Sequence, residues 1–202
     1  MKHLLKYLLA AAALPLWGQA AAAGPFGQLR GLCEPGKSVL LTAPTVVEGI
    51  VVSDFHSKNM EANPSVSYDK VDVTVNDCTA YLESPDGRYG FRLKFAAPAD
   101  NVCLRGEQVK ILLDGVTLSR ESDPMRYTLR GLKAGNIEKA AEASALEPKA
   151  RTIATLTDDD LYTFVTLRDA EFVFKEGSYT NIWEPYAQSC GCLLYTSPSP
   201  RD

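Results

Sequence analysis

The chain has 202 residues, of which 46% are hydrophobic and 23% charged, and its formal net charge is −4. An acidic balance gives no general attraction for phosphate backbones, so it argues against a nucleic-acid ligand. Beyond the N-terminal region there is no second long apolar stretch, which argues against a membrane-spanning segment.

Residues 1–23 have the three parts of a secretory signal peptide. Met1 to Lys6 is basic, Tyr7 to Trp17 is apolar but short for a bilayer, and Ala20 to Ala23 offers small residues for cleavage. Cleavage is expected after Ala23 or Ala20. A buried N-terminal helix is the alternative. We expect an exported, unlipidated protein in the periplasm, on the cell surface or outside the cell.

The middle of the chain is predicted to form short β-strands, because apolar residues alternate with polar ones between Gly-rich turns. In residues 89–95, this alternation places Phe91, Leu93 and Phe95 inward, so Arg92 and Lys94 are expected to face outward. The predicted strands are residues 46–53, 70–75, 89–95, 108–114, 116–119 and 126–129, and only residues 137–146 have a helical composition. This pattern predicts an all-β domain over residues 24–142, a closed or nearly closed antiparallel barrel of the OB type.

Three short motifs resemble the DUF5689 family, a domain of unknown function in secreted Bacteroidetes-type proteins. They are Gly49-Ile-Val-Val-Ser-Asp54, Gly106-Glu-Gln-Val-Lys-Ile-Leu-Leu-Asp-Gly115 and Tyr127-Thr-Leu-Arg-Gly131. The chain departs from the expected pattern at Val73-Thr-Val-Asn-Asp-Cys78, where a ligand-type strand and a Gly-rich turn are expected. The resemblance implies an OB-like fold and an exported location, and it implies no activity.

Four cysteines precede the C-terminal tail: Cys33, Cys78, Cys103 and Cys190. An even number in an exported chain allows two disulfides in three pairings. We favour Cys78 with Cys103, because both flank the same predicted hairpin. Buried thiols are the alternative.

A second unit is expected after residue 142. Residues 143–151 contain Pro148 and are predicted to be a linker, and residues 152–191 are predicted to begin a second, truncated β module. Within it, Thr157 or Asp158 can cap a short turn, and residues 163–174 alternate like another first barrel strand.

The tail, residues 192–202, reads Cys-Leu-Leu-Tyr-Thr-Ser-Pro-Ser-Pro-Arg-Asp. Its codons can be written so that they match a transposase-type sequencing-library adapter, and Gly191 can supply the adapter's first base. We therefore expect the tail to be an artefact on a truncated frame; a natural Ser/Pro tail is the alternative. Without Lys2, Lys6, Arg201 and Asp202, 18 basic and 24 acidic residues remain, a net charge of −6.

Groups for catalysis or for metal binding are scarce. His56 is the one histidine after the signal peptide and is expected to be a solvated loop residue, and the sequence has no H-x-x-x-H or C-x-x-C metal motif. Asp158 to Asp160 lacks the alternating ligands of a calcium loop and is expected to be a solvated helix start. No cofactor is predicted.

Aromatic and basic side chains are the candidates for binding. OB-type barrels bind oligosaccharides or single strands by stacking on exposed rings. Tyr81, Tyr89 and Tyr127 are ring platforms or core residues, and core packing is favoured for them. The candidate binding residues are Tyr179, Trp183, Tyr186, Arg92 and Lys94.

Two classes of function remain. The preferred one is an exported, non-catalytic binding or adaptor module for a surface glycan or a protein partner. The alternative is the N-terminal accessory domain of a secreted hydrolase or nuclease whose catalytic part follows Gly191.

Overall fold

The computed structural model describes residues 25–57, 74–122, 125–143, 146–172 and 194–196. The predicted signal peptide lies outside these residues. The helices are α1 (Pro25–Gly31), η1 (Phe55–Ser57), α2 (Thr74–Asp77), η2 (Pro98–Asp100), η3 (Ala134–Asn136), η4 (Ile153–Thr155) and η5 (Asp158–Asp160). The strands of the main sheet are β1 (Ser38–Leu40), β2 (Val46–Val51), β3 (Thr79–Glu83), β4 (Gly90–Phe95), β5 (Glu107–Leu112), β6 (Thr117–Ser122), β7 (Met125–Leu132) and β8 (Ile137–Ala143). Four further strands pair outside it: β9 (Lys149–Arg151), β10 (Val165–Leu167), β11 (Ala170–Phe172) and β12 (Leu194–Thr196).

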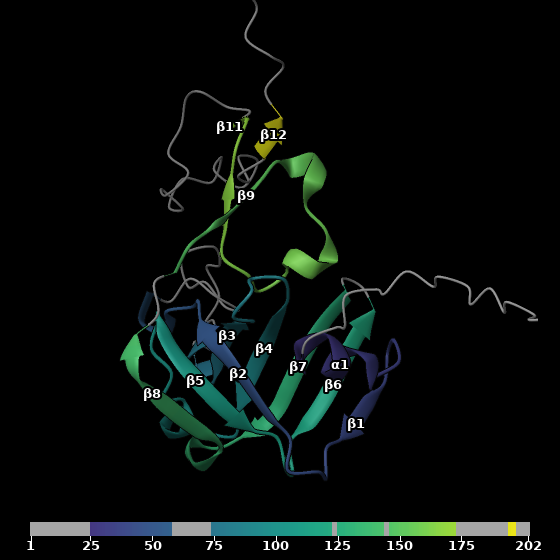
Figure 1. The fold of residues 1–202 in the computed structure, drawn as a ribbon, viewed down its shortest axis with the longest axis vertical. Helices are drawn as coiled ribbons and strands as arrows, with labels where there is room; N and C mark the ends of the chain where they lie inside the picture. The colour runs from purple at the N-terminus through teal and green to yellow at the C-terminus, as the bar shows by residue number, and fades with distance from the viewer. Residues whose placement is uncertain (1–24, 58–73, 123–124, 144–145, 173–193, 197–202) are drawn as a thin grey trace, which may run out of the picture.

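The main sheet has eight strands in the order β1-β6-β7-β4-β3-β2-β5-β8. Only residues 113–116 join β5 to β6, although these strands stand near opposite ends of that order. The sheet must therefore curl so that β5 and β6 meet where residues 113–116 join them. In Figure 1, β8 and β5 lie on the left and β6 and β1 on the right. The prediction of an all-β fold is confirmed, and the OB type stays a prediction. One detail was wrong: the sheet is mixed rather than antiparallel throughout, because β4 and β7 pair in parallel.

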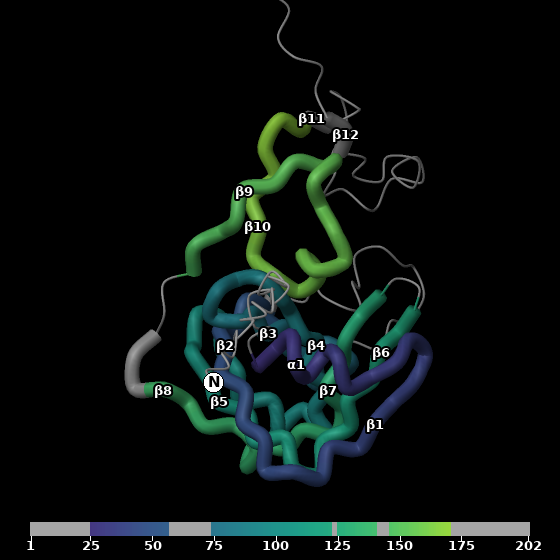
Figure 2. Tube along the Cα trace, turned by 45° about the vertical axis from the view of Figure 1, so that its right-hand side comes forward, coloured from purple at the N-terminus to yellow at the C-terminus, as the bar shows by residue number. Residues whose placement is uncertain are grey.

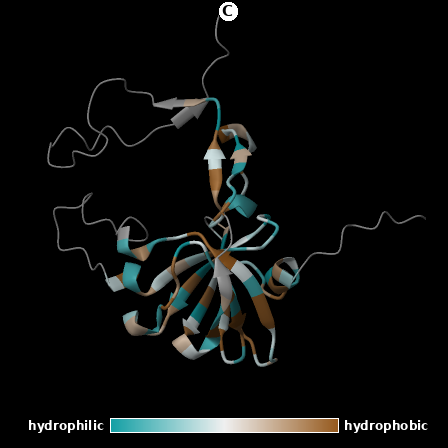
Figure 3. Cartoon of the chain, turned by 60° about the vertical axis from the view of Figure 1, so that its left-hand side comes forward, coloured by the Kyte–Doolittle hydropathy of each residue, from teal (hydrophilic) through white to brown (hydrophobic). Residues whose placement is uncertain are grey.

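The core fills the inside of this curled sheet. The hairpin from β3 to β4 turns at Gly87, whose φ of 66° suits a glycine and whose N–H donates to the Ser84 carbonyl at 2.8 Å. Beyond the turn, Phe91, Leu93 and Phe95 are buried in the core, as predicted. Figure 3 shows hydrophobic and hydrophilic residues following each other along the strands. This alternation leaves the opposite side of the sheet to polar residues.

The helix α1 covers one end of the barrel and packs directly on its core. Phe26 and Leu29 are buried, and the ring of Phe26 lies 5.1 Å from that of Phe91. The Arg30 guanidinium lies over the rings of Tyr127 and Tyr89, 4.3 and 4.8 Å from their centroids. Aromatic faces attract such a cation, and the contact fixes α1 to β7 and to the residue that precedes β4.

Residues 149–164, called here the overlying segment, lie against the same end of the barrel (Figure 2). A Cβ added to Gly90 would stand 2.3 Å from the Leu161 carbonyl oxygen. Only a glycine permits that approach between backbones. Tyr162 holds a φ of 62°, which is uncommon for a bulky residue. The division into a linker over 143–151 and a second module over 152–191 stays a prediction.

Three predicted elements differ in the structure. Thr74 and Val75 begin the helix α2 rather than ending a strand, and the Thr79 hydroxyl donates to the Val75 carbonyl at 2.5 Å. Residues 137–143 form β8 despite their helical composition, because pairing with β5 satisfies backbone groups that would otherwise lie at a sheet edge. The strand predicted over 163–174 is interrupted at Asp169, whose φ is 52°. Among the residues that the structure describes, no helix is long and apolar enough to cross a bilayer.

Candidate binding face

The outer side of four neighbouring strands carries a continuous group of polar residues, called here the polar face. Its members alternate along each strand with core residues: Thr79 and Tyr81 of β3, Arg92 and Lys94 of β4, Thr117, Ser119 and Glu121 of β6, and Arg126, Thr128 and Arg130 of β7. One cross-strand row runs Tyr81, Arg92, Thr128, Ser119, and the next runs Thr79, Lys94, Arg130, Thr117. Neighbours in such a row have side chains within reach of one another.

Arg92 stands in the middle of the polar face, where it is only 5% exposed. As predicted, its side chain points away from the core, but other parts of the protein cover it. Its Nε donates to the Thr128 hydroxyl at 3.0 Å, and its guanidinium forms an ion pair with Glu121. A buried cation requires such partners, since desolvation alone would be costly.

Glu121 joins three arginines. Besides Arg92, its carboxylate lies 3.0 Å from the Nε of Arg126 and 3.3 Å from a terminal nitrogen of Arg130. Lys94 is half-buried, and its Nζ donates to the Thr79 hydroxyl at 2.7 Å. The polar face thus carries four basic groups and one carboxylate, although the chain as a whole is acidic.

A pair of tyrosines lies at one end of the polar face. The rings of Tyr81 and Tyr162 are 4.6 Å apart with an interplanar angle of 36°. Tyr81 is the direct cross-strand neighbour of Arg92, whereas Tyr162 belongs to the overlying segment. Half-buried rings beside cations are a combination that can stack on a sugar ring and hold its polar groups.

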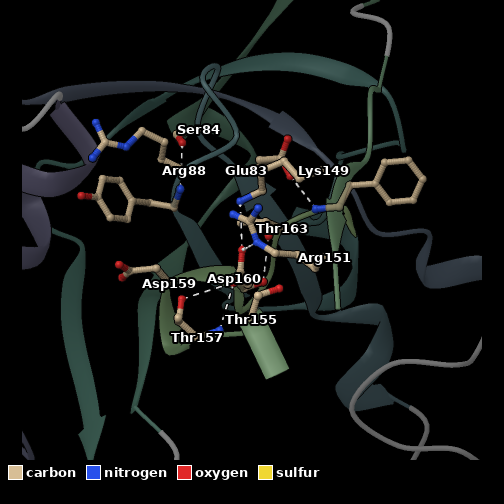
Figure 4. A network of polar contacts seen from close by, with 12 residues as sticks. Glu83, Ser84, Arg88, Lys149, Arg151, Thr155, Thr157, Asp159, Asp160 and Thr163 are labelled. Carbon is tan, nitrogen blue, oxygen red and sulfur yellow. Dashed lines mark hydrogen bonds and ion pairs between the residues drawn. The ribbon is translucent and has the colours of Figure 1, made fainter. Parts of the chain in front are cut away.

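Two carboxylates hold the overlying segment in place (Figure 4). Glu83, at the end of β3, accepts a hydrogen bond from the Phe164 N–H. Burial raises the pKa of Glu83, although that hydrogen bond and the charge of Lys149 act against the increase.

The second carboxylate, Asp160, was predicted to be solvated but is 8% exposed. It accepts from the Thr157 N–H, from Lys149 and from Arg151, at 3.0, 3.2 and 3.0 Å. Burial alone would raise its pKa, but these donors hold the pKa of Asp160 below its ordinary value. Asp160 is therefore surrounded by the overlying segment, including Lys149 and Arg151, and not by the solvent that was expected.

The remaining predicted residues fall in different places. Tyr127 is buried in the core, and Tyr89 packs against it, so both are core residues rather than ring platforms. The exposed His56 contacts Asp54 at 3.2 Å, as expected for a loop residue. Tyr179, Trp183 and Tyr186 lie outside the described residues.

The structure shows Cys78 and Cys103 as thiols, so it does not contain the disulfide predicted between them. Their segments are nevertheless adjacent, because the Asn101 amide donates to the carbonyls of Asp77 and Thr79 at 2.9 and 3.1 Å. Across the described parts of the chain, no three metal-ligating side chains come together.

Sequence reasoning missed Glu121, Arg126 and Arg130. The signal was present, because Thr117, Ser119 and Glu121 alternate around Leu118, as Arg126, Thr128 and Arg130 alternate around Tyr127 and Leu129. Only the parallel pairing of β4 with β7 brings these residues beside Arg92, and that pairing joins residues far apart in the chain.

Neither a family model, nor a curated protein, nor a solved structure matches this chain. The resemblance to the DUF5689 family therefore stays a prediction.

Proposed function

We propose that this protein is an exported, non-catalytic binding module that holds a glycan on its polar face. The observation that carries the proposal is the group of Lys94, Arg126 and Arg130 on one face, where both arginines contact Glu121, with the tyrosine pair at the end of the same face. Charged donors can bind the hydroxyl and acidic groups of sugars, and ring faces can pack on their apolar sides.

The non-catalytic character is proposed from the chemistry of the described carboxylates. Glu121 is tied to three arginines, and Asp160 accepts from Thr157, Lys149 and Arg151, which stabilises its ionised form. Glu83 has a raised pKa but lies under the overlying segment, bonded to Phe164. Most glycoside hydrolases use two carboxyl groups that face one substrate, whereas these three carboxylates have structural partners.

The test is binding of defined oligosaccharides by calorimetry, with the product recovered and its mass measured. Lys94→Gln removes one charge from the polar face, and Lys110→Gln removes an exposed lysine from β5 as a matched control. We expect weaker binding for Lys94→Gln, unchanged binding for Lys110→Gln, and a ligand recovered intact. If both variants and the parent chain bind with equal affinity, the glycan does not bind at the polar face. A cleaved ligand would contradict the proposal that the protein is non-catalytic.

A further inference from the structure

A shallow hollow of about 410 Å³ lies beside the polar face, where β1 pairs with β6. Its walls include Lys37, Ser38, Ser119, Arg120, Glu121 and Arg130. The volume is in the range of ligand sites, which measure roughly 300–1,000 Å³. It is built on β1, β6 and β7 rather than on β3 and β4.

The hollow has an excess of positive charge. Lys37 and Arg130 contribute two cations, and the one carboxylate in its wall is Glu121. That carboxylate is already shared by Arg92, Arg126 and Arg130. An anion in the hollow would therefore experience the cations more strongly than the single carboxylate.

One hydroxyl in the hollow is set to donate. The Ser119 oxygen accepts from the Ser38 hydroxyl at 2.9 Å and from the Nε of Arg130 at 3.3 Å, which leaves the proton of Ser119 to be donated. Serine and arginine donors on adjacent strands suit the several oxygens of one sulfate, phosphate or carboxylate group.

The turn beside the hollow is held in place from both sides of β6. The Arg120 guanidinium lies on the core side, where one terminal nitrogen donates to the Cys33 carbonyl at 3.4 Å and the guanidinium is 5.3 Å from the centre of the Tyr127 ring. Two backbone hydrogen bonds, from Gly36 to the Arg120 carbonyl at 2.8 Å and from Arg120 to the Lys37 carbonyl at 3.0 Å, hold the turn that carries Lys37. Such preorganisation lowers the entropic cost of binding.

We propose that this hollow binds the oxyanion group of an acidic glycan, a sulfate or a carboxylate, while the rest of the ligand lies on the polar face. The placement of the sugar on the polar face rests on the proposed function. The hollow's preference for an oxyanion stands on the residues of the hollow alone.

The test compares a sulfated oligosaccharide with its desulfated counterpart on the full chain, and adds inorganic sulfate as a separate probe. Lys37→Gln changes the hollow only, Lys94→Gln changes the polar face only, and Lys110→Gln is the control. We expect Lys37→Gln to lower the affinity for the sulfated ligand roughly threefold to fivefold, as for one exposed charge pair, and to leave the affinity for the desulfated ligand unchanged. Lys94→Gln should lower the affinity for both ligands. Added salt should reduce the preference for sulfate.

The outcomes separate the two proposals. If both glycans bind and Lys37→Gln leaves their affinity ratio unchanged, the hollow is not the oxyanion site, and the polar face stands. If sulfate binds in a Lys37-dependent way but neither glycan does, the hollow stands and the proposed function fails. Tighter, Lys37-dependent binding of a single-stranded oligonucleotide would show that the oxyanion is a phosphate and that the glycan class is wrong.

Discussion

Arg30 and Asp159, 129 residues apart in the chain, form an ion pair that joins α1 to the overlying segment. The two side chains differ in environment, because Arg30 is 7% exposed and Asp159 is 56% exposed. Arg30 also contacts the rings of Tyr89 and Tyr127. The arginine is therefore part of the packing at the end of the barrel, whereas the aspartate lies at its surface.

This difference predicts unequal effects of removing either partner. Arg30→Gln should lower the free energy of unfolding by about 2 kcal/mol, since it removes two cation–π contacts and the packing of a buried stem. Asp159→Asn should cost less than about 1 kcal/mol, as expected for a solvent-exposed partner. Urea denaturation measures both values. Equal losses would mean that the ion pair, and not the aromatic contact, holds α1.

Gly90 is expected to tolerate no side chain. In Gly90→Ala the new Cβ would stand 2.3 Å from the Leu161 oxygen and 2.6 Å from the Tyr162 carbonyl carbon, both of which are backbone atoms. The substitution should cost about 1–3 kcal/mol or displace the overlying segment. Limited proteolysis within residues 149–164 and thermal unfolding measure the two effects.

Gly135→Ala is the matched control, because its Cβ would meet no atom within 4 Å. It should be close to neutral in both measurements. Proteolysis that is unchanged in Gly90→Ala, together with unchanged stability, would show that the overlying segment does not rest on β4.

The raised pKa of Glu83 predicts that the stability of the protein depends on pH. Burial raises its pKa in the folded protein, so the folded state binds the proton more tightly than the unfolded state does. The free energy of unfolding should consequently fall as the pH rises from the ordinary value of 4.5 through the higher folded pKa.

In Glu83→Gln that decrease should be absent, since the amide oxygen can still accept from Phe164 and no charge forms. The measurement is the difference in unfolding free energy between Glu83→Gln and the parent chain at several pH values across that window. A difference that stays constant over the window would contradict the burial of an ionisable group at this position.

Cys103 should react slowly with alkylating reagents. Burial, with a smaller contribution from Glu107, raises the pKa of its thiol to about 12, so very little reactive thiolate forms at neutral pH. Peptide mapping after iodoacetamide treatment should find Cys103 modified only in denaturant, and the half-buried Cys78 modified earlier. If Cys103 resists even in denaturant until a reductant is added, a disulfide is present, as the sequence predicts.

Local alternation was enough to predict part of this fold. Phe91, Leu93 and Phe95 point to the core because the side-chain period of a strand is two, and no distant partner is needed to infer it. Residues 137–143 could not be predicted in this way. Their alanines, their glutamates and Lys139 favour a helix, and only pairing with β5 makes them a strand.

Of the polar face, the sequence predicted only Arg92 and Lys94 as candidate binding residues. The alternation that faces Arg92 away from the core says nothing of its burial, which depends on Glu121, 29 residues away, and on Thr128 of a parallel neighbour. The tyrosine pair likewise requires the overlying segment to reach β3, and no local pattern in residues 149–164 indicates that contact.

The most direct test of binding at the polar face is to map backbone amide chemical shifts during titration with an acidic oligosaccharide that binds. The largest changes should fall on Arg92, Lys94, Thr128 and Arg130, in adjacent strands β4 and β7, with little change at Lys110 of β5. Saturable changes that centre on β5 or η2, and leave β4 and β7 unaffected, would contradict a binding site on the polar face.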